Sequence, residues 1–334
     1  MTAIVFIIVF GLLVFIHELG HFATAKFSGI TVHEFALGMG PKIFSWEGKE
    51  TTYSLRALPI GGYVRMEGED EASETSGSFS EKSPWQRLAV IAAGPIMNFI
   101  LAIVVITGLF MIDGFPINTV GELIDGAPAQ QAGLQVGDEI INIDGNTVSS
   151  WDDVVTSISS AESDALQIEI VRDGMKQKLT IEAMKEEETG RRIIGIRPGF
   201  EKNIFKAMKY AVLGVFLTVK MILQYLGSLL IGQGDLSQVS GPVGIYNAVS
   251  EASQMGIRRV LDITAMLSIN LGLINLLPFP ALDGGRIIFI GLEILRGKPI
   301  DAEKEGFVHF IGFVVLMTLM VLLVMKDLNI GGGL

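Results

Sequence analysis

Residues 12–27, "LLVFIHELGHFATAKF", place two histidines and a glutamate at the end of the uncharged run Met1–Ile16. Ionisable side chains at membrane depth are costly to desolvate and normally face a protein interior or a water-filled cavity. On a helix, His17 and His21 lie on one face with Cβ atoms about 5–6 Å apart, so both imidazoles can reach one metal ion. The H-E-x-x-H pattern is typical of two zinc ligands with the glutamate, here Glu18, as general base. The alternative is a structural histidine pair with a polar partner, which gives no gain to offset the desolvation of three ionisable groups.

Composition indicates a membrane protein. The 334 residues are 49% hydrophobic, and the mean hydropathy is +0.49. Four stretches without Asp, Glu, Lys or Arg approach the length of about 20 residues that spans a bilayer. They are Met1–Ile16, Leu88–Ile112, Ile263–Leu282 and Gly306–Met325. The first has no basic flank and no small-residue cleavage site, so we expect a retained span. The sequence therefore predicts a polytopic α-helical membrane protein with about four transmembrane helices.

Net charge and cysteine content exclude two kinds of site. A formal net charge of −11 without a basic face argues against a nucleic-acid partner. The absence of cysteine excludes disulfides and thiolate metal ligands. Much of the acidity lies in residues 66–84, "MEGEDEASETSGSFSEKSP", whose Ser/Glu/Gly-rich composition predicts a mobile loop.

Between the second and third apolar runs, Asp113–Phe200 has the pattern of a soluble domain. Apolar and polar residues alternate as in strands over 138–145, 166–174 and 176–184. The last two are predicted to pair as a hairpin across Asp173-Gly174. Residues 149–160 are predicted to form a helix capped by Ser150. We therefore expect one small α+β domain here.

A second polar group interrupts the third apolar run, in "NLGLINLLPFPALDGGR" at residues 270–286. Pro278 and Pro280 break a helix just before Asp283, which is tolerated at membrane depth only where the backbone faces protein or water. An aspartate there is a functional candidate, although a helix-terminal aspartate before a glycine turn would give the same pattern. Because a catalytic zinc usually has three protein ligands and one open position, we predict that Asp283 is the third ligand.

Five motifs together resemble the site-2 protease family of intramembrane zinc metalloproteases, of the bacterial RseP/RasP type with a single PDZ domain. They are HELGH at 17–21, LPIGGYVRM at 58–66, AAGPIMNF at 92–99, SGPVGI at 240–245 and NLLPFPALDGG at 275–285. The resemblance covers almost the whole chain. It implies one catalytic Zn²⁺ bound by His17, His21 and Asp283, with Glu18 activating the attacking water.

The resemblance also implies a substrate class and a location. Members of the family cleave within the transmembrane segments of single-span proteins already trimmed outside the membrane, such as anti-sigma factors or signal-peptide remnants, in regulated intramembrane proteolysis. The implied location is the bacterial inner or plasma membrane, with the lipid bilayer as a partner. The rival interpretation is a non-catalytic membrane scaffold that holds partners through its soluble domain. It leaves the presence of Glu18 beside a complete ligand set unexplained.

The soluble insert resembles a circularly permuted PDZ domain in "GAPAQQAGLQVGDEIINIDG" at 126–145 and "IIGIRP" at 193–198. PDZ domains add an extended peptide to a sheet edge and capture its terminal carboxylate. The domain is therefore expected either to bind substrate or to filter it by size, and a groove with only a structural role is the alternative. Some relatives carry two such inserts in tandem, so substrate filtering can differ in detail.

Membrane depth fixes the predicted topology, because His17 and Asp283 must meet. With the N-terminus outside, the first span carries His17 inward, and a third span entering from outside carries Asp283 to the same side. The metal site then lies near the cytoplasmic face and the PDZ-like insert lies outside. An extra crossing would separate the ligands, so residues 203–232 are predicted to lie along the outer interface. Three lysines interrupt that stretch: Lys206, Lys209 and Lys220.

The predicted organisation has eight segments. They are a first transmembrane helix with HELGH (1–29), a cytoplasmic-side β-hairpin region and acidic loop (30–85), a second transmembrane helix (86–112), the PDZ-like domain (113–200), an interfacial amphipathic helix and SGPVG loop (201–257), a third transmembrane helix with the LDG motif (258–285), a cytoplasmic loop (286–305), and a fourth transmembrane helix with the tail (306–334).

Residues 53–66, "YSLRALPIGGYVRM", alternate like a strand and contain a Gly-Gly break. A transmembrane substrate must unwind before its peptide bonds can be cut. We predict that Gly61, Gly62 and Tyr63 belong to a sheet edge beside the zinc, to which the unwound substrate adds as a strand. A small cytoplasmic sheet without a substrate role is the alternative.

Four further polar residues are assigned individually. Asn275, within the LDG motif region, is predicted to hold substrate backbone or the oxyanion, or else to bridge two helices. Asn98 is assigned to helix packing. His33 and His309 have no motif around them and are left outside the site.

Overall fold

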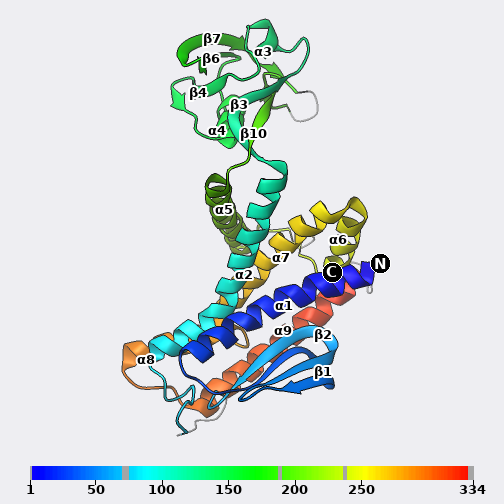
Figure 1. Cartoon of the computed structure of the whole chain (residues 1–334), viewed down its shortest axis with the longest axis vertical. Coiled ribbons are helices and arrows are strands. Elements are labelled where there is room, and N and C mark those ends of the chain that lie inside the picture. The colour runs from blue at the N-terminus through cyan, green and yellow to red at the C-terminus, as the bar shows by residue number, and fades with distance from the viewer. Residues whose placement is uncertain (1, 70–74, 187–189, 236–238, 330–334) are drawn as a thin grey trace. The chain divides into compact units, whose positions relative to one another are not determined.

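The computed structural model describes residues 2–69, 75–186, 190–235 and 239–329. Two compact units are distinguished: Met1–Ile106 together with Met208–Leu334, and Thr107–Ala207. The elements wholly or mainly in the first unit are α1 (Thr2–Phe27), β1 (Val32–Glu47), β2 (Thr52–Met66), α2 (Pro84–Asp113), α5 (Ile204–Leu230), α6 (Pro242–Met255), α7 (Ile257–Leu276), α8 (Asp283–Arg296) and α9 (Ala302–Asp327) (Figure 1). The predicted acidic loop includes residues 70–74, which lie outside the described residues.

Two glycines let α1 and α2 pack at very short distances. A Cβ added at Gly20, inside the HELGH motif, would lie 2.4 Å from the carbonyl oxygen of Ala93. A Cβ added at Gly94 would lie 2.3 Å from Nε2 of His21. No side chain fits at either position, and small residues of this kind allow close helix approach in membrane proteins. Glycine therefore brings the histidine-bearing face of α1 onto α2.

The strands β1 and β2 each bend, so that together they form a sheet of four segments. Residues 32–37 pair with 62–66 on one side and with 52–55 on the other, and residues 44–47 pair with 52–55. The bend in β1 lies at Gly38, whose φ of +87° favours glycine. Within the described part of the chain, segment 62–66 has a strand neighbour on one side only and so forms an edge of this sheet.

The third predicted span ends earlier than expected. The helix α7 ends at Leu276, and the chain turns before Asp283 begins a new helix, α8. Pro278 and Pro280 lie in this turn, where proline lacks the N–H that a continuing helix would need. Asp283 is therefore a helix-initiating residue and not the last residue of a span.

Two predicted loops are helical instead. The cytoplasmic loop expected at 286–305 contains most of α8, because Ile287, Ile290 and Ile294 recur at helical spacing and pack into a core with residues of α1 and the sheet. The predicted SGPVG loop at 240–244 is likewise helical from its third residue, because α6 starts at Pro242. Proline is well suited to the first turn of a helix.

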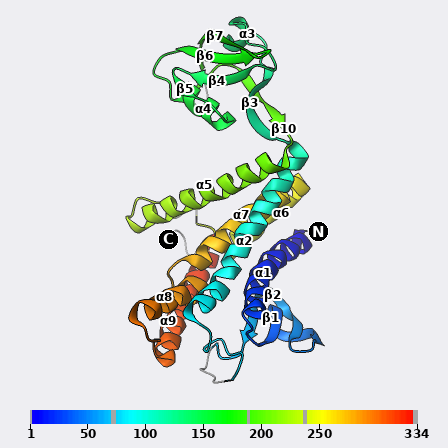
Figure 2. The same ribbon diagram turned by 60° about the vertical axis from the view of Figure 1, so that its left-hand side comes forward.

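Five helices in the described residues are long and apolar enough to cross a membrane: α1, α2, α5, α7 and α9. Four were predicted as spans, and α5 is the addition. One face of α5, with Val215 and Val219, clusters with Ala102 of α2 and with Ala265 and Ile269 of α7. Figure 2 shows α5 running across α2 and α7 and not alongside them.

The polar residues of α5 support the interfacial position predicted for it. Lys209, Lys220 and Gln224 are exposed, and positions 11 and 4 residues apart lie on the same side of a helix with 3.6 residues per turn. This stripe is turned away from Val215. Lysines facing hydrocarbon in the middle of a span are costly, whereas an interfacial helix lets them reach headgroups. The interfacial position of α5 remains a prediction.

The second unit contains the α+β domain. Its elements are β3 (Phe115–Leu123), α3 (Pro128–Gln131), β4 (Glu139–Ile143), β5 (Asn146–Thr147), α4 (Trp151–Ser159), β6 (Ala165–Arg172), β7 (Met175–Glu182), β8 (Met184–Lys185), β9 (Arg192–Ile193) and β10 (Ile196–Glu201). The main sheet has the order β10-β3-β4-β6-β7, with β5 paired to β4. Its edge strand β10 begins within the IIGIRP motif, at Ile196.

Two local predictions for this domain are confirmed. Arg172 pairs with Met175 across the predicted Asp173-Gly174 turn. The side chain of Ser150 caps α4 in a reciprocal capping box with Asp153. Buried isoleucines on β4 and β6 form the core: Ile140, Ile143, Ile168 and Ile170.

Single cysteines test the position of α5, since the native chain has none. If α5 lies along the outer interface, an impermeant thiol reagent added to intact cells labels Asp235→Cys and Gly190→Cys. Thr75→Cys is labelled only after lysis, which also serves as the control that the site is reactive. Protection of position 235 in cells whose position 190 is labelled would show that α5 crosses the membrane.

Candidate active site

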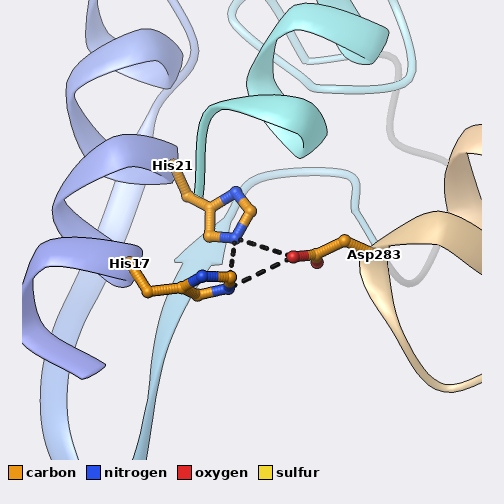
Figure 3. A group of neighbouring side chains, drawn as sticks. All are labelled: His17, His21 and Asp283. Carbon is orange, nitrogen blue, oxygen red and sulfur yellow. Dashed lines mark hydrogen bonds and ion pairs between the residues drawn. The ribbon is translucent and has the colours of Figure 1, made fainter. Parts of the chain in front are cut away.

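Three side chains from two distant segments converge in the first unit. In Figure 3, His17 and His21 point from α1 toward Asp283 at the start of α8. The Nε2 atoms of the two histidines are 3.2 Å apart. The Oδ2 atom of Asp283 lies 3.1 Å from Nε2 of His17 and 3.5 Å from Nε2 of His21. These residues form a group that could hold a metal ion.

The spacing of these atoms fits a tetrahedral zinc ion. Bonds of about 2.0–2.2 Å at tetrahedral angles place ligand atoms about 3.4 Å apart. The Oδ2 atom of Asp283 is buried and accepts no hydrogen bond, although both imidazoles face it. A buried carboxylate oxygen left in this state is strongly unfavourable unless a cation is bound. Two imidazole nitrogens and one carboxylate are also a donor set that zinc prefers.

A backbone carbonyl orients His21. Its Nδ1–H donates to the carbonyl oxygen of Val90 at 2.9 Å. This contact fixes the proton on Nδ1 and leaves the Nε2 lone pair directed at Asp283. Ligating histidines are usually held by such an outer hydrogen bond.

The side-chain amide of Asn98 occupies the equivalent position at His17. Asn98 is fully buried, and its amide nitrogen lies 3.1 Å from Nδ1 of His17. Its Oδ1 atom has no partner. Rotating the amide places Oδ1 against Nδ1–H of His17 and leaves Nε2 free to bind a metal, so we assign this orientation. The packing role assigned from the sequence missed this contact; an uncharged polar residue in an apolar helix was the available signal.

Glu18 lies in the same cavity as the three convergent residues. The cavity measures about 460 Å³ and is also lined by Gly62, Tyr63 and Arg286. A Cβ added at Gly62 would lie 2.9 Å from Cγ of Glu18 and 3.0 Å from a methyl of Val14. The backbone of β2 therefore passes directly over the Glu18 side chain, which only glycine permits.

A buried ionic cluster holds the strand that carries Tyr63. Glu34 accepts hydrogen bonds from Ser54 at 2.7 Å and from Arg56 at 2.9 Å, and lies 3.2 Å from the ammonium of Lys42. Arg56 also donates to the Tyr63 hydroxyl. Burial alone would raise the pKa of Glu34, but these hydrogen bonds lower it to about 2. The cluster therefore stays ionised at neutral pH and links three segments of the sheet.

The remaining residues considered from the sequence do not all line the cavity. Gly61 adopts a φ of +77° beside Gly62. Asn275 is not among the described residues lining the cavity, and its amide donates to the carbonyl of Leu271 at 3.0 Å. His33 pairs with Glu67 at 2.6 Å, away from the cavity. His309 was placed outside the site from its sequence, but its side chain lines the cavity.

The chain is similar to known proteins along most of its length. The model for Peptidase family M50 matches residues 5–319. The regulator of sigma-W protease RasP of Bacillus subtilis is 37% identical, and the alignment covers 98% of each chain. The zinc metalloprotease RasP of Bacillus licheniformis is 36% identical over 98% of this chain and 99% of its own.

Among solved structures, the PDZ domain of an SdrC-like protein from Listeria monocytogenes is 28% identical to this chain. The match covers 26% of this chain and 87% of that chain, with a TM-score of 0.22.

The family model spans nearly the whole sequence, and both RasP proteins align from end to end. The chain therefore belongs to Peptidase family M50, the site-2 protease family of intramembrane zinc metalloproteases.

Proposed function

We propose that His17, His21 and Asp283 bind the catalytic zinc of this metalloprotease and that Glu18 is its general base. The convergence of two Nε2 atoms and one buried carboxylate oxygen within 3.1–3.5 Å carries this assignment. Glu18 lines the same cavity without being one of the three. A non-catalytic scaffold would need neither three convergent metal ligands nor the additional carboxylate of Glu18 beside them.

Each residue has a defined task in peptide hydrolysis. When bound, zinc polarises the peptide carbonyl and makes a water nucleophilic near neutral pH. The Glu18 carboxylate accepts the proton of the attacking water and delivers it to the leaving amine. Val90 and Asn98 keep the Nε2 atoms of His21 and His17 directed at the ion.

The edge of the sheet is suited to hold the unwound substrate. Segment 62–66 has one side unpaired by strands in the described residues, and Gly62 lies against Glu18. An extended peptide added there forms main-chain hydrogen bonds that an intact helix could not offer. Gly61, Gly62 and Tyr63 would then place a peptide bond next to the metal ligands. A sheet that serves only to support α1 is the competing interpretation, and Asn275 remains a second candidate for substrate contact.

The substrates are proposed from the chemistry of the site and from the relatives. A relative is named as a regulator of sigma-W protease, so anti-sigma factors are one substrate class, with signal-peptide remnants as another. Substrates are single-span proteins trimmed before cleavage. The PDZ domain lies outside the cytoplasm and restricts access, and the active site lies near the cytoplasmic face.

Glu18→Gln is expected to leave bound zinc unchanged and to abolish cleavage, because it removes the proton acceptor and not a ligand. Loss of general-base catalysis lowers rates by about 10²–10⁴-fold. Zinc content by elemental analysis and turnover of a single-span substrate in detergent are the two measurements. Equal turnover in mutant and wild type would refute the assignment of Glu18.

Asp283→Ala is expected to lower zinc content, because a site with two protein ligands holds zinc poorly. Asp262→Ala is the matched control, since Asp262 is paired with Arg259 on the surface of α7. Undiminished zinc in the Asp283 variant would point to a different third ligand.

Gly62→Ala is expected to reduce cleavage by about tenfold or more at full zinc content, because the added methyl displaces Glu18 and the substrate edge. Gly11→Ala in α1 is the control, since nothing lies within 4 Å of its added Cβ. Wild-type activity in the Gly62 variant would argue against a strand edge that works at close contact with the base.

Replacement of residues 113–198 by a flexible linker is expected to retain cleavage of trimmed substrates and to admit longer ones. The reason is that none of the described residues of the domain lines the cavity around Glu18. The measurement compares cleavage of one transmembrane segment fused to short and long ectodomains. If the two substrates are still discriminated as in the intact enzyme, the filter role fails.

A further inference from the structure

His309 lies at the boundary between the active-site cavity and a neighbouring cavity of about 510 Å³. It comes from α9 and is 26 residues away from Asp283 in sequence. None of the catalytic roles proposed for this site falls to His309, and it is outside the group of convergent ligands. One of its contacts is nevertheless with Ala281, two residues before Asp283.

The imidazole of His309 binds the turn that precedes Asp283. Its Nδ1 atom accepts a hydrogen bond from the backbone N–H of Ala281 at 2.9 Å. Ala281 has a φ of +73°, a left-handed conformation that residues other than glycine seldom adopt. Such a conformation persists where its surroundings hold it in place. His309 supplies one of these restraints, two residues before Asp283.

A second contact of α9 acts on the same turn. Gly312 lies one helical turn after His309, and a Cβ added there would lie 2.4 Å from the carbonyl oxygen of Pro280. The face of α9 that carries both residues is therefore pressed against a single peptide group of the turn, the one that joins Pro280 to Ala281. Few other parts of α9 are buried, so this contact is a local anchor and not part of broad helix packing.

The anchor matters because the ligands come from separate elements. His17 and His21 are one turn apart on α1, so the helix itself sets their spacing. Asp283 follows a proline-broken turn, and its place relative to α1 depends on how that turn is held. Without an acceptor, the Ala281 N–H would lose its partner, which disfavours the conformation that directs Asp283 at the histidines.

We propose that His309 is a positioning residue of the zinc site, acting through its Nδ1 atom on the left-handed turn that carries Asp283. The inference rests on the ligand set proposed above. Accepting at Nδ1 requires the proton of the neutral ring on Nε2. That atom is buried without a hydrogen-bond partner, 3.9 Å from Oε1 of Glu305. The two ring nitrogens therefore have different surroundings, and substitutions can separate them.

Three variants of the full-length enzyme distinguish the two nitrogens. His309→Asn places an acceptor oxygen where Nδ1 was, His309→Gln places its amide near the position of Nε2, and His309→Leu offers neither. Zinc affinity is measured by competition with a chromophoric chelator, and turnover is measured at saturating zinc. His33→Leu, outside the cavity, is the control. Loss of an outer residue of a zinc site typically lowers metal affinity or activity by about 10–100-fold.

The expected result is a loss of zinc affinity in that range for the Leu and Gln variants, with the Asn variant within about threefold of wild type. Rescue by Gln and not by Asn would show that Nε2 is the important atom and overturn the proposal. Equal losses in all three variants, or none in any, would overturn it as well. Failure of the ligand set itself is a separate outcome, visible as undiminished zinc in Asp283→Ala.

Discussion

Three ionisable side chains, those of His17, His21 and Asp283, are removed from water in the interior of the first unit, and the arrangement of its helices follows from that cost. His17, His21 and Asp283 converge in the interior of the first unit, between helices rich in apolar residues, and the buried Oδ2 of Asp283 has no hydrogen bond to compensate it. Uncompensated charge at membrane depth costs several kcal/mol even after relaxation. A divalent cation shared by all three, as proposed, would remove that cost. The helices, the broken turn and the outer hydrogen bonds can each be understood by what they contribute to that convergence.

Close backbone approach provides the convergence. Gly20 and Gly94 bring α1 and α2 together at distances that no side chain would permit. Contact at this distance lets Val90 and Asn98 of α2 reach the Nδ1 atoms of the two histidines. The same device recurs at Gly62, where β2 passes over Glu18. Glycines in the HELGH, AAGPIMNF and LPIGGYVRM motifs therefore pack the elements that carry the proposed ligands and Glu18.

The parts of the site that were predictable from sequence are those encoded by local spacing. His17 and His21 are neighbours on any helix, and Glu18 follows from the same motif. Asp283 could be proposed because a polar residue in an apolar run needs a reason. The capped helix of the inserted α+β domain and its hairpin turn were likewise local and are confirmed. The start of α8 at Asp283 was missed because a helix after two prolines resembles a loop when only its first residues are considered.

Asn98 and His309 show why the remainder was not predictable. Asn98 is 81 residues from His17, and His309 is 28 residues from Ala281. Neither contact leaves a periodic signal, since each depends on how two elements pack. An isolated polar residue on an apolar helix is equally consistent with helix packing and with support of a ligand. Only the tertiary arrangement distinguishes these roles.

X-ray absorption at the zinc edge of the purified full-length enzyme tests whether His17, His21 and Asp283 bind zinc. We expect one zinc per chain with only nitrogen and oxygen neighbours at about 2.0–2.2 Å. We also expect outer-shell scattering from two imidazoles, which falls to one imidazole in any zinc retained by His21→Ala. Zinc without imidazole scattering, or scattering from two imidazoles that persists unchanged in that variant, would contradict it.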